Sequence, residues 1–237
     1  MKTHLDSSTP VSREFTNVPL VRCAGLARTF GRGSSAVVAL HHATCEIEAG
    51  QLVALVGPSG SGKSTLLHLL AGLDSPTAGT LEWPALADAP LRPGPVAVVF
   101  QAPSLLAPLD VLENVALPLL LAGAERAPAN EAALAALRAL GLDTIATKLP
   151  DELSGGQAQR VAIARALAGS PRLILADEPT GQLDHDTAAA VVDALIAAAE
   201  RSGAALVIAT HDHDIATRFT TRWRVADGRL YTNGPGR

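Results

Sequence analysis

Cysteine and positive charge are both scarce in this chain of 237 residues. The only two cysteines, Cys23 and Cys45, stand far apart and lack the C-x-x-C spacing of zinc sites and redox motifs. We therefore expect neither a disulfide framework nor a zinc site, and this cysteine usage fits a reducing cytoplasm. Lys and Arg number 19 against 23 Asp and Glu, giving a net charge of −4. That balance argues against nucleic acid as a partner, because such binding depends on clustered basic charge.

Long apolar runs are also missing. Nowhere do about 18 uninterrupted apolar residues occur, so no segment is expected to span a bilayer. The most apolar region, residues 105–122, is interrupted by Pro108, Asp110, Glu113 and Pro118. If the protein works at a membrane, a separate chain must provide the channel. Residues 1–17 are polar and predict a mobile N-terminal tail, not a secretory signal.

Four short apolar runs predict the central strands of a parallel sheet that is buried on both faces. The runs are residues 52–56, 96–100, 173–176 and 205–209. Each is followed by a residue suited to phosphate chemistry, in chain order Gly57, Gln101, Asp177 and His211. Because ligands of open α/β sheets bind beyond the carboxyl ends of the strands, we expect these residues to meet at one edge.

The remaining pattern predicts an α/β domain with two additions. Helices are expected over residues 64–71, 131–140 (with Asn130 as N-cap), 158–168 and 187–201. Residues 18–50 predict a small antiparallel sheet, and the mostly helical residues 102–164 predict a lobe inserted between two core strands. Without an internal repeat, residues 18–237 are expected to form a single domain.

The first chemical motif follows the first core strand. It matches the phosphate-binding pattern GxxxxGK[ST] and is followed by Thr65; its residues are Gly57, Pro58, Ser59, Gly60, Ser61, Gly62, Lys63 and Ser64. Its glycines let backbone N–H groups curl around phosphate, and the helix N-terminus adds a favourable dipole. Lys63 is expected to neutralise the β- and γ-phosphates, and the hydroxyl of Ser64 to bind Mg²⁺. The strand and helix on either side favour this interpretation over a Gly/Ser-rich surface turn.

Two further motifs lie downstream. Asp177 ends its strand where a carboxylate can hold Mg²⁺, and Glu178 is the candidate general base for an attacking water. Residues 153–157 place Ser154, Gly155, Gly156 and Gln157 at the start of a predicted helix, a second anion site of the same physical kind. By itself, this last motif would fit a capped helix without a ligand.

Together, in this order and with the run LSGGQAQRVAIARAL, the three motifs resemble the ATP-binding cassette (ABC) ATPases, the motor subunits of ABC transporters. The resemblance covers about residues 18–230. It implies a P-loop NTPase fold that binds ATP and Mg²⁺ and hydrolyses ATP. It also implies that residues 154–157 grip the γ-phosphate of ATP held by a partner protomer, in a head-to-tail dimer with two ATP molecules at the interface.

Four single residues gain a role only from this resemblance. Gln101 resembles the glutamine that contacts the metal or the water, and His211 the histidine that contacts γ-phosphate. Asp184 resembles the aspartate that crosses the dimer interface. Phe30 is the candidate for stacking on adenine, and a core phenylalanine is the alternative. The His211-x-His213 spacing does not indicate a metal site, because no third ligand cluster supports it.

Residues 100–123 and 176–184 resemble one branch of the family, which includes lipoprotein-release, macrolide-efflux and cell-division ATPases. The branch implies a separate few-span permease as partner, at the cytoplasmic face of the membrane. Two residues depart from it: Asp110 replaces the usual threonine, and Gln182 the usual asparagine. The alternative in the same branch is a cell-division or signalling ATPase that regulates an extracytoplasmic enzyme without transport. A GTPase or a small-molecule kinase is disfavoured, because the guanine motif and the Arg-rich lid are missing.

Overall fold

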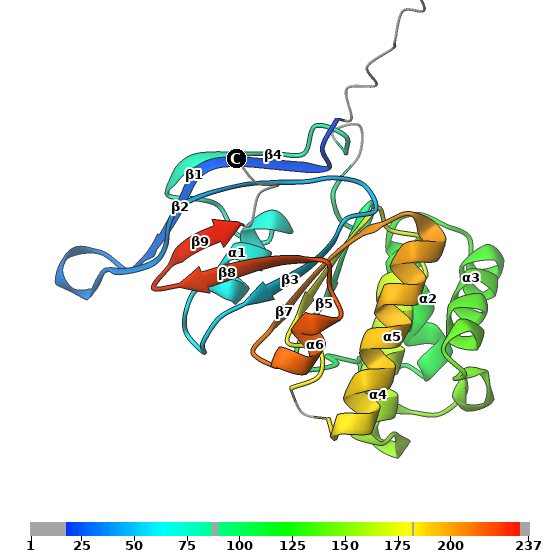
Figure 1. The fold of residues 1–237 in the computed structure, drawn as a ribbon. Helices are drawn as coiled ribbons and strands as arrows, with labels where there is room; N and C mark the ends of the chain where they lie inside the picture. The colour runs from blue at the N-terminus through cyan, green and yellow to red at the C-terminus, as the bar shows by residue number, and fades with distance from the viewer. Residues whose placement is uncertain (1–17, 87–89, 182, 233–237) are drawn as a thin grey trace, which may run out of the picture.

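The computed structural model describes residues 18–86, 90–181 and 183–232, and Figure 1 shows how they are arranged. The predicted mobile tail, residues 1–17, lies outside the described residues, as does Gln182. Within the described part, one curled nine-stranded sheet has the strand order β4-β1-β2-β9-β8-β3-β7-β6-β5.

The half of the sheet that was predicted from apolar runs is parallel, as expected. Its strands are β3 (Leu52–Val56), β5 (Val96–Val99), β6 (Leu173–Asp177) and β7 (Ala205–Thr210), and they pair in the order β3-β7-β6-β5. On the other side of β3, β8 (Thr221–Ala226) also pairs in parallel. The predicted α/β class with a mainly parallel core sheet is therefore confirmed.

The N-terminal strands form the predicted antiparallel part. β1 (Val21–Phe30) pairs with β2 (Val37–Ile47), and a short 3₁₀ helix, Gly33–Ser35, lies between them. Cys23 and Cys45 stand directly opposite each other in this ribbon, with their sulfur atoms 3.0 Å apart and both side chains buried. Two further strands, which like β8 were not predicted, complete the sheet: β4 (Ala78–Glu82) lies beside β1, and β9 (Arg229–Thr232) lies between β2 and β8.

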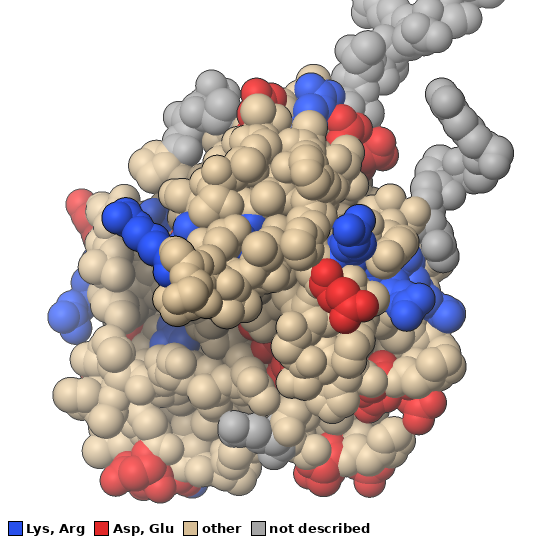
Figure 2. Space-filling model, turned by 90° about the vertical axis from the view of Figure 1, so that its left-hand side faces the viewer, with Lys and Arg blue, Asp and Glu red and all other residues tan. Residues whose placement is uncertain are grey.

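Figure 2 views the molecule from the side on which the β1–β2 ribbon projects in Figure 1. Much of the surface in this view is uncharged, with Lys, Arg, Asp and Glu side chains scattered over it. Three large apolar side chains of the ribbon are exposed, those of Phe30, Val37 and Val38. The ribbon therefore presents apolar surface to solvent, although its other face is part of the core.

Two apolar clusters hold helices against opposite faces of the parallel strands. The first joins Leu55 and Val207 to α1 (Lys63–Leu70) and to the antiparallel strands. The second joins Ile208, on the opposite face of the sheet, to α5 (His185–Ser202) and α6 (His213–Thr217). Side chains on both faces are buried because successive residues of a strand point to opposite sides. This burial explains the uninterrupted apolar runs of the sequence.

A third cluster belongs to three helices of the segment 102–168. These are α2 (Val111–Leu121), α3 (Arg126–Ala139) and α4 (Gly155–Leu167), and short 3₁₀ helices at Asp143–Ile145 and Pro150–Glu152 connect α3 to α4. Within α4, Val161 and Ala164 contribute to this third cluster, whereas Ile163 contributes to the cluster under the sheet. α4 therefore packs both against the other helices of segment 102–168 and against the parallel sheet, and it joins the two.

Helix starts are where the structure departs from the expected boundaries. α3 begins at Arg126, so the expected N-cap, Asn130, lies inside the helix. Pro128 is tolerated because it occupies the first turn, where its missing N–H would have no helical partner. α4 begins at Gly155, directly after Ser154, whose side chain caps it, so the glycine pair opens this helix as the second motif predicts.

The local structure explains why an aspartate is suitable at position 110. It is the N-cap of α2: its Oδ1 accepts a hydrogen bond from the Glu113 backbone N–H at 2.8 Å, and its own N–H donates to the Glu113 carboxylate at 3.2 Å. Aspartate and threonine both cap helix starts, so the departure from threonine preserves the cap.

Candidate nucleotide site

The phosphate-loop motif lies between β3 and α1, in the predicted strand–loop–helix setting. Gly62 precedes α1 with φ of +108°, and a Cβ atom added there would lie 2.4 Å from the carbonyl oxygen of Ala39. Only glycine fits this position without a shift of the backbone. Lys63 begins the helix and is only 4% exposed; its Nζ donates to the carbonyl oxygens of Gly57 at 3.0 Å and Pro58 at 3.1 Å.

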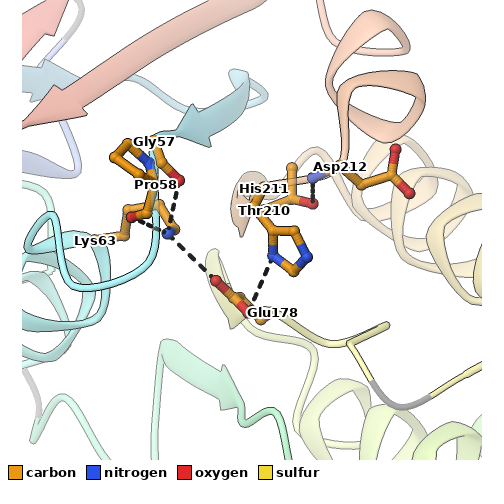
Figure 3. Close-up of polar contacts among 7 residues, drawn as sticks. All are labelled: Gly57, Pro58, Lys63, Glu178, Thr210, His211 and Asp212. Atoms are coloured by element: carbon orange, nitrogen blue, oxygen red, sulfur yellow. Dashed lines mark hydrogen bonds and ion pairs between the residues drawn. The ribbon is translucent and has the colours of Figure 1, made fainter.

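Glu178 lies between two potentially cationic side chains (Figure 3). Its Oε1 is 3.3 Å from Lys63 Nζ, and its Oε2 is 3.3 Å from His211 Nδ1. Glu178 has a left-handed backbone with φ of +43°, and its N–H donates to the Ala209 carbonyl oxygen at 3.0 Å. The loop after β3 and the ends of β6 and β7 thus bring together three side chains that are far apart in the sequence. Of the four residues expected at this edge of the sheet, His211 is one of the three, and Asp177 directly precedes Glu178.

Lys63 and Glu178 line a cavity of about 230 Å³. Its lining includes most of the predicted phosphate loop together with Gln101; the residues are Ala39, Ser59, Gly60, Gly62, Lys63, Ser64, Thr65, Gln101 and Glu178. Ala39 was not predicted, because an alanine in a strand carries no chemical signal. His211 is 63% exposed at its side chain and contacts Glu178 from the neighbouring strand end.

Two buried oxygen atoms near this cavity have no hydrogen-bond partner among the described residues: Oδ1 of Asp177 and Oγ of Ser61. Such orphaned atoms are costly unless a ligand, a water or an ion satisfies them. Asp177 ends β6 directly before Glu178, and Ser64 lines the cavity. Carboxylate and hydroxyl oxygens are hard ligands of the kind that Mg²⁺ takes, so this set fits a magnesium–nucleotide complex.

A multi-ligand transition-metal site has no support in the part of the chain that the structure describes. No group of three or more His, Cys, Asp or Glu side chains there could hold a metal ion. His213, the second histidine of the His-x-His pair, is the first residue of α6.

The second glycine motif lies at the N-terminus of α4, and none of its residues 154–157 lines the cavity. Ser154 accepts a hydrogen bond from the Gln157 backbone N–H at 3.2 Å, and its own N–H donates to Gln157 Oε1 at 3.0 Å. A Cβ added at Gly155 would meet nothing within 4 Å, whereas one added at Gly156 would lie 2.6 Å from Thr187 Cγ2. Gly155 therefore leaves open space at the helix start, and Gly156 allows close packing against α5.

Asp184 and Phe30 stand outside the cavity lining as well. Asp184 is the N-cap of α5 and accepts hydrogen bonds from the Thr187 backbone N–H at 3.0 Å and the Thr187 hydroxyl at 2.7 Å, which lower its pKa. Phe30 is 44% exposed, and the Arg28 guanidinium carbon lies 4.6 Å from its ring centroid. Its exposure is not that of a core phenylalanine.

Comparison with known families identifies the architecture. The family model described as ABC transporter matches residues 40–181, more than half of the chain. The chain belongs to the ABC transporter family. This membership implies an ATP-binding ATPase domain that is homologous to the ATPase subunits of transporters.

Solved structures of ABC cassettes superpose over nearly the whole chain. The dimeric structure of MJ0796, a bacterial ABC transporter cassette, is 35% identical, with a TM-score of 0.80, and covers 91% of this chain and 100% of that chain. A dimeric post-hydrolysis state of MJ0796 bound to ADP and Pi gives the same values. The cbiO1 protein from Clostridium perfringens, part of the ABC transporter complex cbiONQ, is 25% identical, with a TM-score of 0.78, over 90% of this chain and 87% of that chain. Among the described residues of this ABC cassette, no helix is both long and apolar enough to cross a membrane.

Proposed function

We propose that this cassette is an ATP-hydrolysing subunit that dimerises on binding ATP and drives a separate membrane permease. The observation that carries the proposal is the contact of Glu178 with both Lys63 and His211 at the edge of the phosphate-loop cavity. A carboxylate held there, beside a phosphate-loop lysine, is placed to act on a water molecule that attacks the γ-phosphate.

Each side chain of the site has a role in this proposal. The backbone N–H groups of residues 57–65 cradle the phosphates, and Lys63 neutralises them. Ser64, Asp177 and Gln101 would hold Mg²⁺, which supplies charge neutralisation at the phosphate oxygens. In the structure Lys63 and His211 both contact Glu178. When they engage phosphate instead, the Glu178 carboxylate is free to accept a proton from the attacking water.

The second glycine motif acts on a partner protomer. Ser154, Gly155, Gly156 and Gln157 lie on a helix start outside the cassette's own cavity, so ATP must reach them from another subunit. Two copies related by a two-fold axis would each complete the other's site, with Asp184 crossing between them. The dimeric structures of MJ0796 support this arrangement. Closure by ATP but not ADP requires contacts with γ-phosphate, which these residues and His211 can make.

The partner we propose is a separate few-span permease at the cytoplasmic face of the membrane. The cassette, residues 18–237, would dock through its helical lobe, residues 102–164, near residues 105–121. Leu106 and Leu121 are exposed in this part of the lobe. The resemblance to the lipoprotein-release and macrolide-efflux branch favours export, lipoprotein release or mechanotransmission, in which the cassette transmits motion across the membrane. Phe30, exposed on the β1–β2 ribbon, would stack on adenine.

The decisive variant is Glu178→Gln. It preserves the shape of the side chain but removes its charge, so ATP hydrolysis should fall by roughly 100- to 10,000-fold while ATP still binds. The oligomeric state of the purified variant, measured by light scattering, should be dimeric with ATP and monomeric with ADP. Adding Ser154→Arg to this variant is the matched control, and should bind ATP as a monomer.

Two results would count against the proposal. Near-normal hydrolysis in Glu178→Gln would remove Glu178 from the role of base. A dimer that forms equally with ATP, ADP or no nucleotide would mean that γ-phosphate does not close the interface. If the isolated cassette stays monomeric with ATP, the same measurement on its complex with a permease in detergent decides whether closure needs the membrane partner.

A further inference from the structure

The two cysteines of the chain form a pair across the β1–β2 ribbon. Cys23 is 1% and Cys45 6% exposed, and both belong to the apolar cluster that joins α1 to the antiparallel strands. They are partners in the antiparallel register, and their sulfur atoms lie 3.0 Å apart. The sequence contains no third cysteine, so each thiol has only the other as a disulfide partner within the chain.

The register of the ribbon already meets the requirement of a disulfide bond. Directly opposed residues of antiparallel strands have Cα atoms about 4.5–5.5 Å apart. Disulfides form across Cα separations of about 4.4–6.8 Å, so the backbone of the pair lies within the permitted range. An S–S bond is about 2.0 Å long, so the two sulfur atoms need to approach by only about 1 Å, and the strands need neither slide nor separate.

The two thiols differ in acidity. The hydrogen bond from the Cys45 thiol favours the thiolate of Cys23 and lowers the pKa of Cys23. The same bond, together with burial, raises the pKa of Cys45. Since the thiolate is the reactive form of cysteine, Cys23 is the nucleophile of the pair, and Cys45 is the protonated thiol that stands beside it.

We infer that Cys23 and Cys45 form a reversible redox site, at which a hydroperoxide converts the two thiols to a disulfide that cross-links β1 to β2. This site goes beyond the proposed function and does not depend on it, because neither cysteine lines the phosphate-loop cavity. Disulfides of proteins in reducing compartments are usually transient and redox-sensing. A pair that is reduced at rest and joined only under oxidising conditions therefore fits the cysteine usage of the sequence.

The oxidation takes two steps. The Cys23 thiolate attacks one oxygen of hydrogen peroxide, the O–O bond breaks, and Cys23 becomes a sulfenic acid while the leaving hydroxide takes up a proton to form water. The Cys45 sulfur then attacks the Cys23 sulfur, the S–O bond breaks, and a second water leaves with the Cys45 proton. Two thiols and one peroxide thus give one disulfide and two waters. Burial slows the first step, because the peroxide reaches Cys23 only when the ribbon opens locally.

The cross-link would close a loop that contains residues 24–44. This loop carries Phe30 and the exposed 3₁₀ turn Gly33–Ser35. Of the residues that line the phosphate-loop cavity, Ala39 alone lies within it. A disulfide stabilises mainly by restraining the unfolded chain, so the oxidised protein should resist unfolding better while its phosphate-binding residues keep their positions.

The test is to treat the reduced, full-length protein with hydrogen peroxide and to map the product by mass spectrometry. Because trypsin cleaves after Lys and Arg, the disulfide should join the peptides 23–28 and 33–63, with a mass two hydrogen atoms below their sum. Thiol titration of the unfolded protein should fall from two equivalents to none. Tm should rise by roughly 4–16 °C, and dithiothreitol should restore both thiols and the original Tm.

Two serine variants serve as matched controls, because each keeps one thiol and retains a hydroxyl at the other position. Neither Cys23→Ser nor Cys45→Ser should show the joined peptides or the rise in Tm. With dimedone, which traps sulfenic acids, Cys45→Ser should be labelled at Cys23 faster than Cys23→Ser is labelled at Cys45, because Cys23 ionises more readily. Oxidation of Met1, the one methionine of the chain, adds its oxygen atom to a different peptide.

The inference fails if peroxide adds oxygen atoms to the cysteines without joining their peptides, or if the disulfide forms between two chains and gives a dimer on a non-reducing gel. It also fails if both thiols survive while free glutathione in a parallel sample is fully oxidised. Joined peptides without a rise in Tm would refute the stabilising cross-link, and equal labelling of the serine variants would remove Cys23 from the role of nucleophile. None of these results bears on the ATP-dependent dimerisation of Glu178→Gln, so the redox site and the proposed function are tested separately.

Discussion

Two adjacent glycines at the start of α4 should respond in opposite ways to the same substitution. A methyl group added at Gly155 points into open space, whereas one added at Gly156 would lie 2.6 Å from Thr187 Cγ2. Both residues lie in the first turn of one helix, so the gain in helix propensity, at most about 1 kcal/mol, is similar for the two. The difference in the free energy of unfolding between Gly155→Ala and Gly156→Ala therefore isolates the contact of Gly156 with α5.

The size of this difference follows from what Thr187 can do. Its side chain is β-branched and stiff, and its hydroxyl donates to Asp184 at 2.7 Å, so rotating the methyl group away breaks that hydrogen bond. Overpacking of this kind typically costs about 1–3 kcal/mol. We expect Gly156→Ala to be less stable than Gly155→Ala by that amount, equivalent to about 2–4 °C in Tm for each kcal/mol in a chain of this size.

Urea unfolding followed by far-UV circular dichroism measures the difference without relying on nucleotide. Thr187→Ser tests the contact from the other side, because it removes Cγ2 and keeps the hydroxyl. In the Gly156→Ala background it should restore most of the lost stability, a coupling of about 0.5–3 kcal/mol between residues in contact. Equal stability of the two alanine variants, or no recovery in the Gly156→Ala, Thr187→Ser protein, would refute the packing argument.

Two further predictions concern helix N-caps. Asp110→Ala should destabilise the protein by about 1 kcal/mol and Asp110→Thr by only a few tenths, since threonine retains a capping oxygen; urea midpoints of the three proteins check this. Hydrogen bonds lower the pKa of Asp184 below its ordinary value of 3.8, so its cap stabilises the native state above that pH and is lost as the pH falls through the lowered pKa. The stability difference between wild type and Asp184→Asn should therefore shrink as the pH is lowered from about 5 to about 3, and a difference that is constant with pH would contradict the assignment.

The parallel strands could be predicted to within about one residue because burial on both faces leaves an uninterrupted apolar run. β4 could not, since Ala78–Glu82 is mostly exposed and is a strand only because it pairs with β1. β8 does carry a signal in the sequence, because polar residues alternate with the buried Trp223 and Val225. The start of α3 had no comparable signal, because Glu125 makes no side-chain capping bond.

The residues of the candidate site were predictable to the extent that local motifs carry them. The phosphate loop and the strand-end position of Glu178 follow from short patterns, and their meeting follows from the topology of parallel strands. Gln159 donates a hydrogen bond to the Phe100 carbonyl oxygen, and Arg165 donates one to the Pro103 carbonyl oxygen. These two contacts could not be predicted, since the accepting carbonyls lie about 60 residues away in the sequence. Any residue type offers a carbonyl, so the sequence of the accepting segment holds no trace of the interaction.

The opposed cysteines of the β1–β2 ribbon give this protein its own chemical reporter. Cys23 and Cys45 are the only thiols of the chain, and both are buried. An aromatic disulfide reagent added to the native protein should therefore react only as fast as the ribbon opens, while the unfolded chain should release two equivalents at once. The rate of colour development in native buffer, with and without ATP, would measure how often the N-terminal strands separate, without any introduced label.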